Sequence, residues 1–573
     1  MATGSTSASL TAALVGLEPF CDVTLDSSPC RSSSADGAAQ FLDDSRMDGH
    51  RAYVLCILYL RCHAILGFGQ SGDKRSARQH CLPWAHLRVG ERRTRRQNWQ
   101  GHIVPDHRSA GRYRTMGMDD RFPAGFVWGA ATSSYQTEGA VAEDGRTPSC
   151  WDVFTSKPGA IRNGDNGNIA CDAYHRLGED LDLMAELGLK SYRFSVAWSR
   201  VIPEGTGPVN PRGIRYYDRL VDGLIERGIQ PTVTLFHWDL PQVLQDRGGW
   251  ASRECAGWFA DYAEVIAEAL GDRVARWITL NEPAVVANHG YRVGTHAPGL
   301  ADPALASAAT HHLLLGHGLA TKRLRSLLGP SASIGITLDP LYAVALNPED
   351  TELAAELAAG KTDLYLQPLL EATYPTLQRD ELVPTPSVVD RGDLDTIAEP
   401  VDFLGVNFYD PVFVARRKQN LGRGESRLAG YPNAVIVHPD GYHVTGMDWI
   451  VDPDSFHSFL LELHERAPGL PIYITENGRA CYDYVDPNGE VHDPERVDYL
   501  RGHIGAVRRA MHDGVDVRGY FAWSLIDNFE WTEGYSQRFG LIFVDFGTKR
   551  RILKDSARFY AEVIASNAVP QLG

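Results

Sequence analysis

Eight short apolar runs of strand length recur along most of the chain. They are continuous rather than alternating with polar residues, which is typical of parallel strands buried on both faces. The runs cover residues 124–132, 190–198, 230–238, 276–283, 332–340, 401–409, 471–478 and 517–525. The pattern therefore predicts eight buried strands.

Amphipathic segments lie between many of these runs, and three of them predict helices in detail. Their apolar positions recur at spacings of three and four, which places them on one helix face. The predicted buried positions are Leu177, Leu181, Met184 and Leu187 in the first helix, Tyr217, Leu220, Leu224 and Ile225 in the second, and Phe259, Tyr262 and Ile266 in the third. Gly188 and Gly228 follow the first two helices. The third is expected to begin at an N-cap Ser252 and to end at Gly271.

Strand and helix alternate through eight repeats, which favours an α/β fold, the (β/α)8 TIM barrel with long loops. A doubly wound open sheet is the competing topology. That fold needs a glycine-rich phosphate turn after its first strand, and residues 128–140 contain no such turn.

The first 118 residues differ from the rest. They are rich in Ser, Ala and Gly, and they contain 15 Lys and Arg against 10 Asp and Glu, a net charge of +5. The chain total of −16 therefore leaves −21 for residues 119–573. We expect residues 1–118 to be a disordered or non-native N-terminal extension, with Met116 or Met118 as the natural start, and residues 119–573 to form the barrel domain.

Two features of this extension leave alternatives to weigh. The apolar run at 52–60 is too short to span a bilayer as a helix, and it lies too far from Met1 to be a secretory signal. The arginine cluster at 91–96 leaves open a tail that binds nucleic acid, although a disordered leader is the favoured interpretation. Without an export signal or a membrane span, the expected location is the cytoplasm.

The acidic balance of the whole chain, with a pI near 5.7, argues against a general nucleic-acid-binding function. Cys150, Cys171, Cys255 and Cys481 are scattered without C-x-x-C spacing, so neither a zinc site nor a disulfide framework is predicted. The sequence does not indicate an oligomeric state.

Three further segments could suggest a metal or phosphate site, and none of them is predicted to bind such a ligand. His311 and His312 are adjacent on a predicted helix and point to different faces, which argues against joint metal binding. Residues 165–168 begin like a calcium loop, but Ala170 and Arg176 stand where that loop needs Gly and Glu, so a turn is predicted. Residues 415–430 are interpreted as a loop rather than a phosphate site. No cofactor is expected.

Polar side chains collect at the carboxyl ends of the predicted strands, where a barrel of this kind carries its chemistry. These residues are Gln136, Glu138, Arg193, His237, Trp238, Asn281, Glu282, Asn407, Tyr409, Glu476, Trp523, Glu530 and Trp531. Two of them, Glu282 and Glu476, are carboxylates that follow apolar strands four and seven. Such burial is costly unless the carboxylate is paired or used.

Aromatic faces and amide groups around two opposed carboxyls suit a sugar. Glycosidic cleavage needs a proton donor at the leaving oxygen and an anion opposite the developing oxocarbenium ion. A barrel that only binds sugars or partners is the alternative from a different class, and the presence of both glutamates argues against it.

The motifs in this chain resemble those of the family 1 glycoside hydrolases, the retaining β-glucosidases of the (β/α)8 class. The resemblance covers roughly residues 120–565. The motifs are FVWGAATSSYQTEGA, YRFSVAWSR, TLFHWDLP, TLNEP, ITENG and FAWSLIDNFEWTEGY, in that order. The resemblance implies a small-molecule β-glycoside substrate and makes residues 119–573 the catalytic domain.

The resemblance also implies a role for each matching position. Glu282 is expected as the general acid/base and Glu476 as the nucleophile, with Arg193 and Tyr409 supporting the ionised nucleophile. The implied substrate-binding residues are Gln136, His237, Asn281, Asn407, Tyr409, Trp523, Glu530 and Trp531. A retaining geometry places the two carboxyls about 5–5.5 Å apart. We expect the raised pKa on Glu282, because Arg193 favours the charge on Glu476.

Two distinctions within the family follow from residues of this chain. Glu530 and Trp531 argue for an unphosphorylated glycone, and Glu282 argues for O-glycosides rather than thioglucosides. β-Galactosidase or β-fucosidase specificity and transglycosylation stay open, because Glu530 can serve both epimers of the sugar and the aglycone loops cannot be assigned.

Overall fold

The computed structural model describes residues 121–377, 383–417, 421, 425–427 and 433–570. The predictions for residues 1–118, including the apolar run at 52–60 and the arginine cluster at 91–96, lie outside the described residues. No helix among the described residues is long and apolar enough to cross a membrane.

The eight predicted strands form one closed barrel, which confirms the (β/α)8 prediction. The strands are β1 (Val127–Ala131), β2 (Ser191–Ser195), β3 (Gln230–Phe236), β4 (Arg276–Asn281), β5 (Ile334–Leu338), β7 (Phe403–Asn407), β13 (Ile472–Asn477) and β14 (Val517–Trp523). All neighbours pair in parallel, and β14 pairs with β1 to close the ring. Their carboxyl ends therefore meet at one end of the barrel.

The barrel strands are buried along almost their whole length, as their continuous apolar pattern indicated. The positions that are not buried are Gln230, Arg276, Tyr473 and Arg518, all at or next to the first residue of a strand. Side chains at the carboxyl ends are therefore enclosed by the barrel and its loops.

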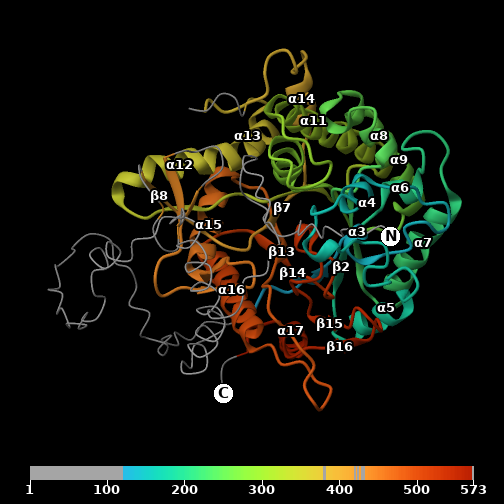
Figure 1. Cartoon of the computed structure of the whole chain (residues 1–573), viewed down its shortest axis with the longest axis vertical. Coiled ribbons are helices and arrows are strands. Elements are labelled where there is room, and N and C mark those ends of the chain that lie inside the picture. The colour runs from blue at the N-terminus through green and yellow to red at the C-terminus, as the bar shows by residue number, and fades with distance from the viewer. Residues whose placement is uncertain (1–120, 378–382, 418–420, 422–424, 428–432, 571–573) are drawn as a thin grey trace, which may run out of the picture. The chain divides into compact units, whose positions relative to one another are not determined.

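Helices follow the strands and surround the barrel, as Figure 1 shows. The principal helices are α5 (Leu177–Glu186), α7 (Pro211–Glu226), α9 (Glu254–Leu270), α11 (Pro303–Leu328), α12 (Thr351–Ala358), α13 (Leu364–Glu371), α15 (Pro453–Arg466), α16 (Pro494–His512) and α17 (Asp555–Ser566). Shorter ones are α3 (Ser134–Thr137), α4 (Cys150–Thr155), α6 (Trp198–Val201), α8 (Gln242–Gln245), α10 (Pro283–Val285) and α14 (Asp393–Ile397). The π-helical turns η3 (Val286–Arg292) and η5 (Ala359–Asp363) lie in the segments after β4 and β5.

The three predicted helices are present as α5, α7 and α9, with two local errors. Ile225 is 47% exposed, because it lies about 100° around α7 from the buried Leu224. Ser252 is not the N-cap of α9. That position is Arg253, and the Ser252 hydroxyl donates to the carboxylate of Glu254 instead of accepting from the helix.

The segments that follow β5, β7 and β14 contain smaller antiparallel or mixed sheets of their own. One contains β6 (Ala343–Ala345), β8 (Val412–Arg416), β10 (Ala434–Val437) and β9 (Glu425–Arg427), and two hairpins contain β11 (His443–Val444), β12 (Ile450–Val451), β15 (Ile542–Val544) and β16 (Arg551–Leu553). The interpretation of residues 415–430 as a loop is therefore wrong at β9 and at the end of β8. The other residues of that segment, apart from Arg417 and Leu421, lie outside the described residues.

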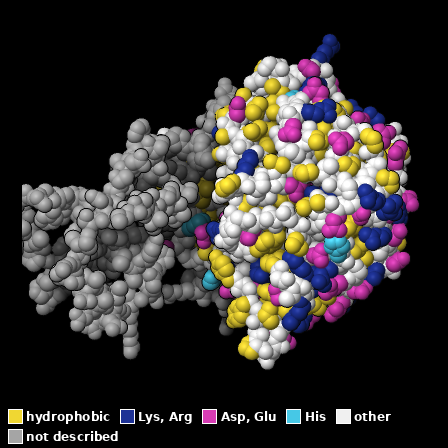
Figure 2. Space-filling model, turned by 45° about the vertical axis from the view of Figure 1, so that its right-hand side comes forward, with side chains coloured by type: hydrophobic (Ala, Val, Ile, Leu, Met, Phe, Trp, Pro, Cys, Tyr) yellow, Lys and Arg dark blue, Asp and Glu magenta, His cyan; other side chains and the backbone are white. Residues whose placement is uncertain are grey.

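Acidic and basic side chains lie intermixed over the face seen in Figure 2.

The segment predicted as a turn, residues 165–168, lies against the segment after β14, because the Asp165 carboxylate accepts the backbone N–H of Tyr535 at 3.0 Å. His311 and His312 both lie buried on α11, and they bind different partners, Asp393 and the Trp250 carbonyl.

Candidate active site

The predicted site residues lie together at the carboxyl end of the barrel. Asn281, Asn407 and Trp523 are the last residues of their strands, Glu476 is the last but one of β13, and Arg193 is the middle residue of β2. The residues that follow their strands are Gln136, His237, Glu282, Tyr409, Glu530 and Trp531. Glu138 lies apart from them, because its carboxylate binds Arg200 at 3.0 Å and Tyr217 at 2.7 Å. It supports the packing of α7 instead.

Glu476 has two donors on its carboxylate. Arg193 donates to Oε1 at 2.6 Å, and the Tyr409 hydroxyl donates to Oε2 at 2.7 Å. Burial raises the pKa of Glu476, while Arg193 and Tyr409 oppose that rise because they favour the ionised form. Both carboxylate oxygens are thus held by groups that stabilise an anion.

Glu282 has a different environment. It is buried, and the side-chain amide of Asn407 donates to its Oε1 at 2.6 Å. Burial raises its pKa well above the usual range, and the negative charges of Asp339 and Glu476 raise it further. Glu282 also adopts a left-handed backbone conformation, φ 48°, which non-glycine residues adopt mainly where surrounding structure imposes it.

One chain of hydrogen bonds joins the two carboxyls. Arg193 holds Glu476 with one guanidinium nitrogen and donates to Asn281 Oδ1 with another at 2.6 Å. Asn407 Nδ2 donates to that same Asn281 oxygen at 3.1 Å and to Glu282. A displacement of either carboxyl is therefore coupled to the other through two amides and one guanidinium group.

The same network determines the proton on His237. Since Asn281 Oδ1 accepts two hydrogen bonds, its amide nitrogen is the group that faces His237 Nε2, at 3.2 Å. Nε2 must accept, so the proton of the neutral ring is on Nδ1. Burial and Arg193 hold the pKa of His237 well below its usual range, and Nδ1 has no partner among the described residues. An N–H donor is left for a ligand.

Aromatic rings line up beside this donor. The His237 ring stacks on Trp523 with centroids 5.9 Å apart and on Trp531 with centroids 6.0 Å apart. Trp238 packs against Trp531 at 4.4 Å, and both adopt positive φ. Gly478 allows β13 and β14 to approach here, since a Cβ at that position would lie 1.8 Å from the Trp523 carbonyl oxygen.

Glu530 is the third carboxyl of the site. Its Oε2 is buried and has no hydrogen-bond partner among the residues that the structure describes, and burial together with Glu476 and Glu533 raises its pKa to about 8. Gln136 fixes the segment that carries it, because the Gln136 amide donates to Asn528 Oδ1 at 3.1 Å and to the Phe529 carbonyl at 2.9 Å. An unsatisfied buried oxygen is costly, and a bound hydroxyl would satisfy it.

Two charged residues near Glu282 were missed at the level of sequence. Asp339 directly follows β5, and Lys361 lies in η5 with its ammonium 2.6 Å from the Asp339 carboxylate. Asp339 is the last residue but one of the apolar run at 332–340, so its place after a strand was a usable signal. Lys361 had none, because only the fold brings η5 to this end of the barrel.

The comparisons with known proteins agree with this geometry. The family model described as glycosyl hydrolase family 1 matches residues 118–569. The chain belongs to glycosyl hydrolase family 1. All of the site residues described above lie inside the matched range, and the closed barrel is the fold that this family membership implies.

Relatives and solved structures from the family cover nearly all of the described chain. Beta-glucosidase A of Thermotoga maritima is 42% identical over 455 residues, which make up 78% of this chain and 99% of that protein. A bifunctional beta-D-glucosidase/beta-D-fucosidase of Bifidobacterium breve is 44% identical over 463 residues, again 78% and 99%. The solved Thermotoga maritima beta-glucosidase in complex with castanospermine matches with a TM-score of 0.74 at 42% identity and covers 79% of this chain and all of that one.

Proposed function

We propose that this glycoside hydrolase is a retaining β-glucosidase that removes terminal non-reducing β-D-glucosyl residues from O-glycosides or cello-oligosaccharides. The observation that carries the proposal is the unequal surroundings of its two central carboxyls. Glu476 binds a guanidinium group and a phenol, whereas Glu282 binds one amide and lies near other negative charges. The names of relatives at 41–46% identity support the glucosidase specificity.

The first step needs an anion and an acid. Glu476, ionised beside Arg193, attacks the anomeric carbon and forms a covalent glycosyl ester. Glu282 gives its proton to the glycosidic oxygen as the bond from that oxygen to the anomeric carbon breaks. The electron pair of the broken bond stays on the leaving oxygen, and Glu282 is left as a carboxylate.

The second step reverses these roles. Ester formation removes the negative charge of Glu476, which had raised the pKa of Glu282. The Glu282 carboxylate now takes a proton from water, and the resulting hydroxide attacks the anomeric carbon and releases Glu476 as an anion. Two inversions at the same carbon give net retention.

The sugar is held by the remaining groups. The Nδ1–H of His237 and the Oε2 of Glu530, neither of which has a partner in the described part of the chain, supply one donor and one acceptor for hydroxyls. Trp523 and Trp531 supply aromatic faces, and Gln136, Asn281, Asn407 and Tyr409 complete the set. The acidic side chain of Glu530 offers a phosphate group no positive counter-charge, which favours an unphosphorylated glycone.

Removal of the nucleophile tests the proposal. The variant Glu476→Ala should lose at least about 10⁴-fold in turnover of aryl β-glucosides. Azide should partly restore turnover, because a small anion fits the space of the missing carboxylate. The restored product should be the α-glucosyl azide, identified by NMR. Near-normal activity of this variant without azide would contradict the assignment.

Removal of the acid gives a different pattern. The variant Glu282→Ala should lose about 10²–10⁴-fold in kcat on cellobiose, whose leaving group needs a proton. Activated aryl glucosides should lose far less in the glycosylation step. Equal losses on both substrate classes would count against an acid role. Aryl galactosides and fucosides in the same panel measure glycone preference.

A further inference from the structure

The ion pair between Lys361 and Asp339 lies near Glu282 and has no role in the two steps described above. Lys361 Nζ lies 2.6 Å from Asp339 Oδ2. The other oxygen of this carboxylate, Oδ1, is buried and has no hydrogen-bond partner in the described part of the chain. The ammonium group therefore compensates the Asp339 charge on one side only.

The fold places Asp339 next to Glu282 through adjacent strands. The backbone N–H of Glu282 donates to the Thr337 carbonyl at 2.9 Å, so the carboxyl ends of β4 and β5 are directly bonded. Asp339 follows Thr337 and Leu338 on the same side of the barrel. The segment after β5 is held to η5, because the Leu341 N–H donates to the Thr362 hydroxyl, next to Lys361, at 3.0 Å.

Charged and titratable groups reach Glu282 from several elements. Asp339 comes from the end of β5, Glu476 from β13 and Lys361 from η5, and Tyr409 follows β7. His289 of η3 and Asp410 lie near Lys361. Asp339 raises the pKa of Glu282 more than Glu476 does, and Lys361 lowers it.

We propose that Asp339 and Lys361 are positioning residues that hold Glu282 as a proton donor in the first step and as a base in the second. This inference rests on the proposed function, since it needs Glu282 to be the acid/base. Asp339 supplies the negative charge, and the ion pair with Lys361 fixes that carboxylate in place.

The need for a second negative charge follows from the cycle. Before the first step, both Asp339 and Glu476 favour protonated Glu282. After ester formation the charge of Glu476 is gone, but the charge of Asp339 remains. Glu282 therefore stays basic enough to accept the proton of the attacking water. A site with Glu476 alone would make Glu282 a weaker base at that moment.

The test is the pH profile of kcat/KM, whose alkaline limb reports the loss of the proton from the acid in the free enzyme. Asp339→Asn removes a negative charge, so its alkaline limb should move to lower pH by about one unit. Lys361→Met removes a positive charge, so the last proton of the coupled carboxyls should leave at higher pH. Opposite shifts from the two partners of one ion pair are the expected result.

Asp402→Asn provides the matched control. Asp402 binds Arg325 at 2.7 Å and the Ile334 N–H at 2.8 Å, at the amino end of the same barrel strands. Its loss also breaks an ion pair, but it should leave the alkaline limb unchanged. Thermal unfolding of all three variants separates a change in stability from a change in the profile.

Failure of the positioning role can be distinguished from failure of the proposed function. If Asp339→Asn and Lys361→Met leave the alkaline limb in place, or shift it in the same direction, the inference is wrong. Glu282→Gln, measured alongside, should still abolish cellobiose hydrolysis in that case. If Glu282→Gln hydrolyses cellobiose normally, the proposed function itself fails, and the positioning role fails with it.

Discussion

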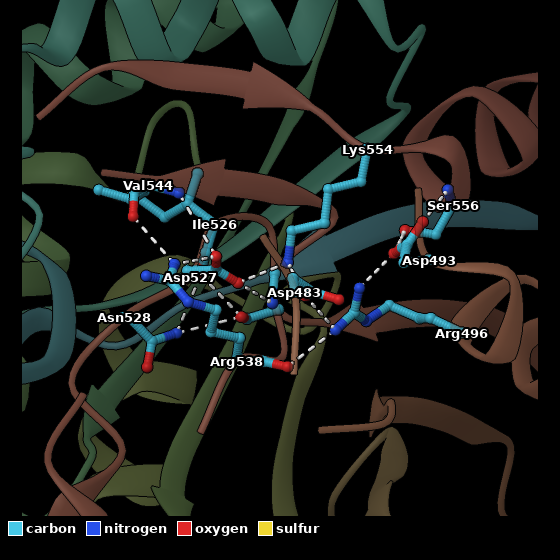
Figure 3. A network of polar contacts seen from close by, with 12 residues as sticks. Asp483, Asp493, Arg496, Ile526, Asp527, Asn528, Arg538, Val544, Lys554 and Ser556 are labelled. Atoms are coloured by element: carbon cyan, nitrogen blue, oxygen red, sulfur yellow. Dashed lines mark hydrogen bonds and ion pairs between the residues drawn. The ribbon is translucent and has the colours of Figure 1, made fainter. Parts of the chain in front are cut away.

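Two groups of charged side chains in this barrel, most of them wholly or partly buried, differ in how completely their charges are paired. One, called here the paired network, consists of Asp483, Asp493, Arg496, Asp527, Arg538 and Lys554 (Figure 3). The other is the active-site cluster of Arg193, Glu282, Glu476, Glu530, Asp339 and Lys361. The first contains three acids and three bases, while the second contains four acids and two bases.

In the paired network, each acid has strong partners. Lys554 Nζ binds Asp483 at 2.6 Å and Asp527 at 2.7 Å, and Arg538 binds the other oxygen of Asp527 at 2.6 Å. Arg496 binds Asp483 at 2.7 Å and also binds Asp493. Burial alone would raise the pKa of Asp483, but Lys554 and Arg496 outweigh it and lower the pKa.

In the active-site cluster, pairing among the described residues is incomplete. Oxygen atoms of Glu530 and Asp339 accept no hydrogen bond from the described residues, and the pKa of Glu282, Glu476 and Glu530 is raised by burial. The backbone is also held in the left-handed region at Glu282, Trp238 and Trp531. Complete pairing thus holds the segments after β13 and β14 together, whereas incomplete pairing leaves polar groups available to a ligand.

The largest effect should come from breaking the paired network. Lys554→Met leaves Asp483 and Asp527 buried with one partner fewer each, so the free energy of unfolding should fall by about 3–5 kcal/mol. Urea denaturation measures this loss. The protein that stays folded should keep its kcat, because Lys554 touches neither Glu282 nor Glu476.

Asp182→Asn is the control for that experiment. Asp182 pairs with Arg227 at 2.6 Å on the surface and is 72% exposed at its side chain. Its loss should change stability by no more than about 1 kcal/mol. A similar small change in Lys554→Met would contradict the view that the paired network is a structural device.

A smaller effect is expected from Tyr409→Phe in the active-site cluster. It removes one hydrogen bond to the Glu476 anion, worth about 1.5–3 kcal/mol, so kcat/KM should fall about 10–100-fold. That bond lowers the pKa of Glu476, so its loss should move the acid limb of the pH profile to higher pH. Steady-state kinetics over a pH series measures both effects.

Tyr262→Phe is the control for this variant. It also removes one buried tyrosine hydroxyl, but at a position outside the active-site cluster. The Tyr262 hydroxyl donates to the Val196 carbonyl at 2.9 Å and to the Leu235 carbonyl at 3.1 Å, behind the barrel strands. Its loss should reduce stability and leave the acid limb unmoved. An equal shift of the limb in both variants would show that Tyr409 acts only through packing.

The smallest effect concerns stability at Glu530. Its pKa is about 8 in the folded protein and 4.5 in the reference state, so the folded state binds a proton more tightly between these values. Stability from this group is complete below about pH 4.5 and is lost as the pH rises through 8. Glu530→Gln should therefore raise Tm by about 1–3 °C at pH 8 and hardly at all at pH 4.5, even as it weakens sugar binding.

Glu533→Gln is the control for the pH dependence. Glu533 lies in the same segment and pairs with Arg162 at 3.0 Å near the surface. Any Tm gain at pH 8 should be smaller than that of Glu530→Gln, because Glu533 only adds to the raised pKa of Glu530. A Tm gain for Glu530→Gln that is the same at pH 4.5 and pH 8 would contradict the raised pKa of Glu530.

Much of the fold could be predicted, because a long apolar run without alternation can be satisfied only by burial on both faces. All eight strands follow from that rule. The sequence signals for helix ends and for buried helix positions were less reliable than those for strands. Serine is a residue type favoured at N-caps, but the Ser252 hydroxyl donates its hydrogen bond to Glu254, two residues later. Ile225 follows the apolar spacing of α7 yet lies beyond the edge of its buried face.

The sequence by itself determined which residues stand at the strand ends, since parallel strands in a closed ring direct all their carboxyl ends to one side. The sequence therefore predicts Glu282 and Glu476 at that end of the barrel, and the structure places both there. Only the tertiary structure decided what surrounds each of them. Hydrogen bonds and charges act over a few ångströms in space, and Arg193, Tyr409, Asp339 and Lys361 reach the two carboxyls from four different segments of the chain. That arrangement gives the two carboxyls unequal surroundings, and no pattern along the chain contains it.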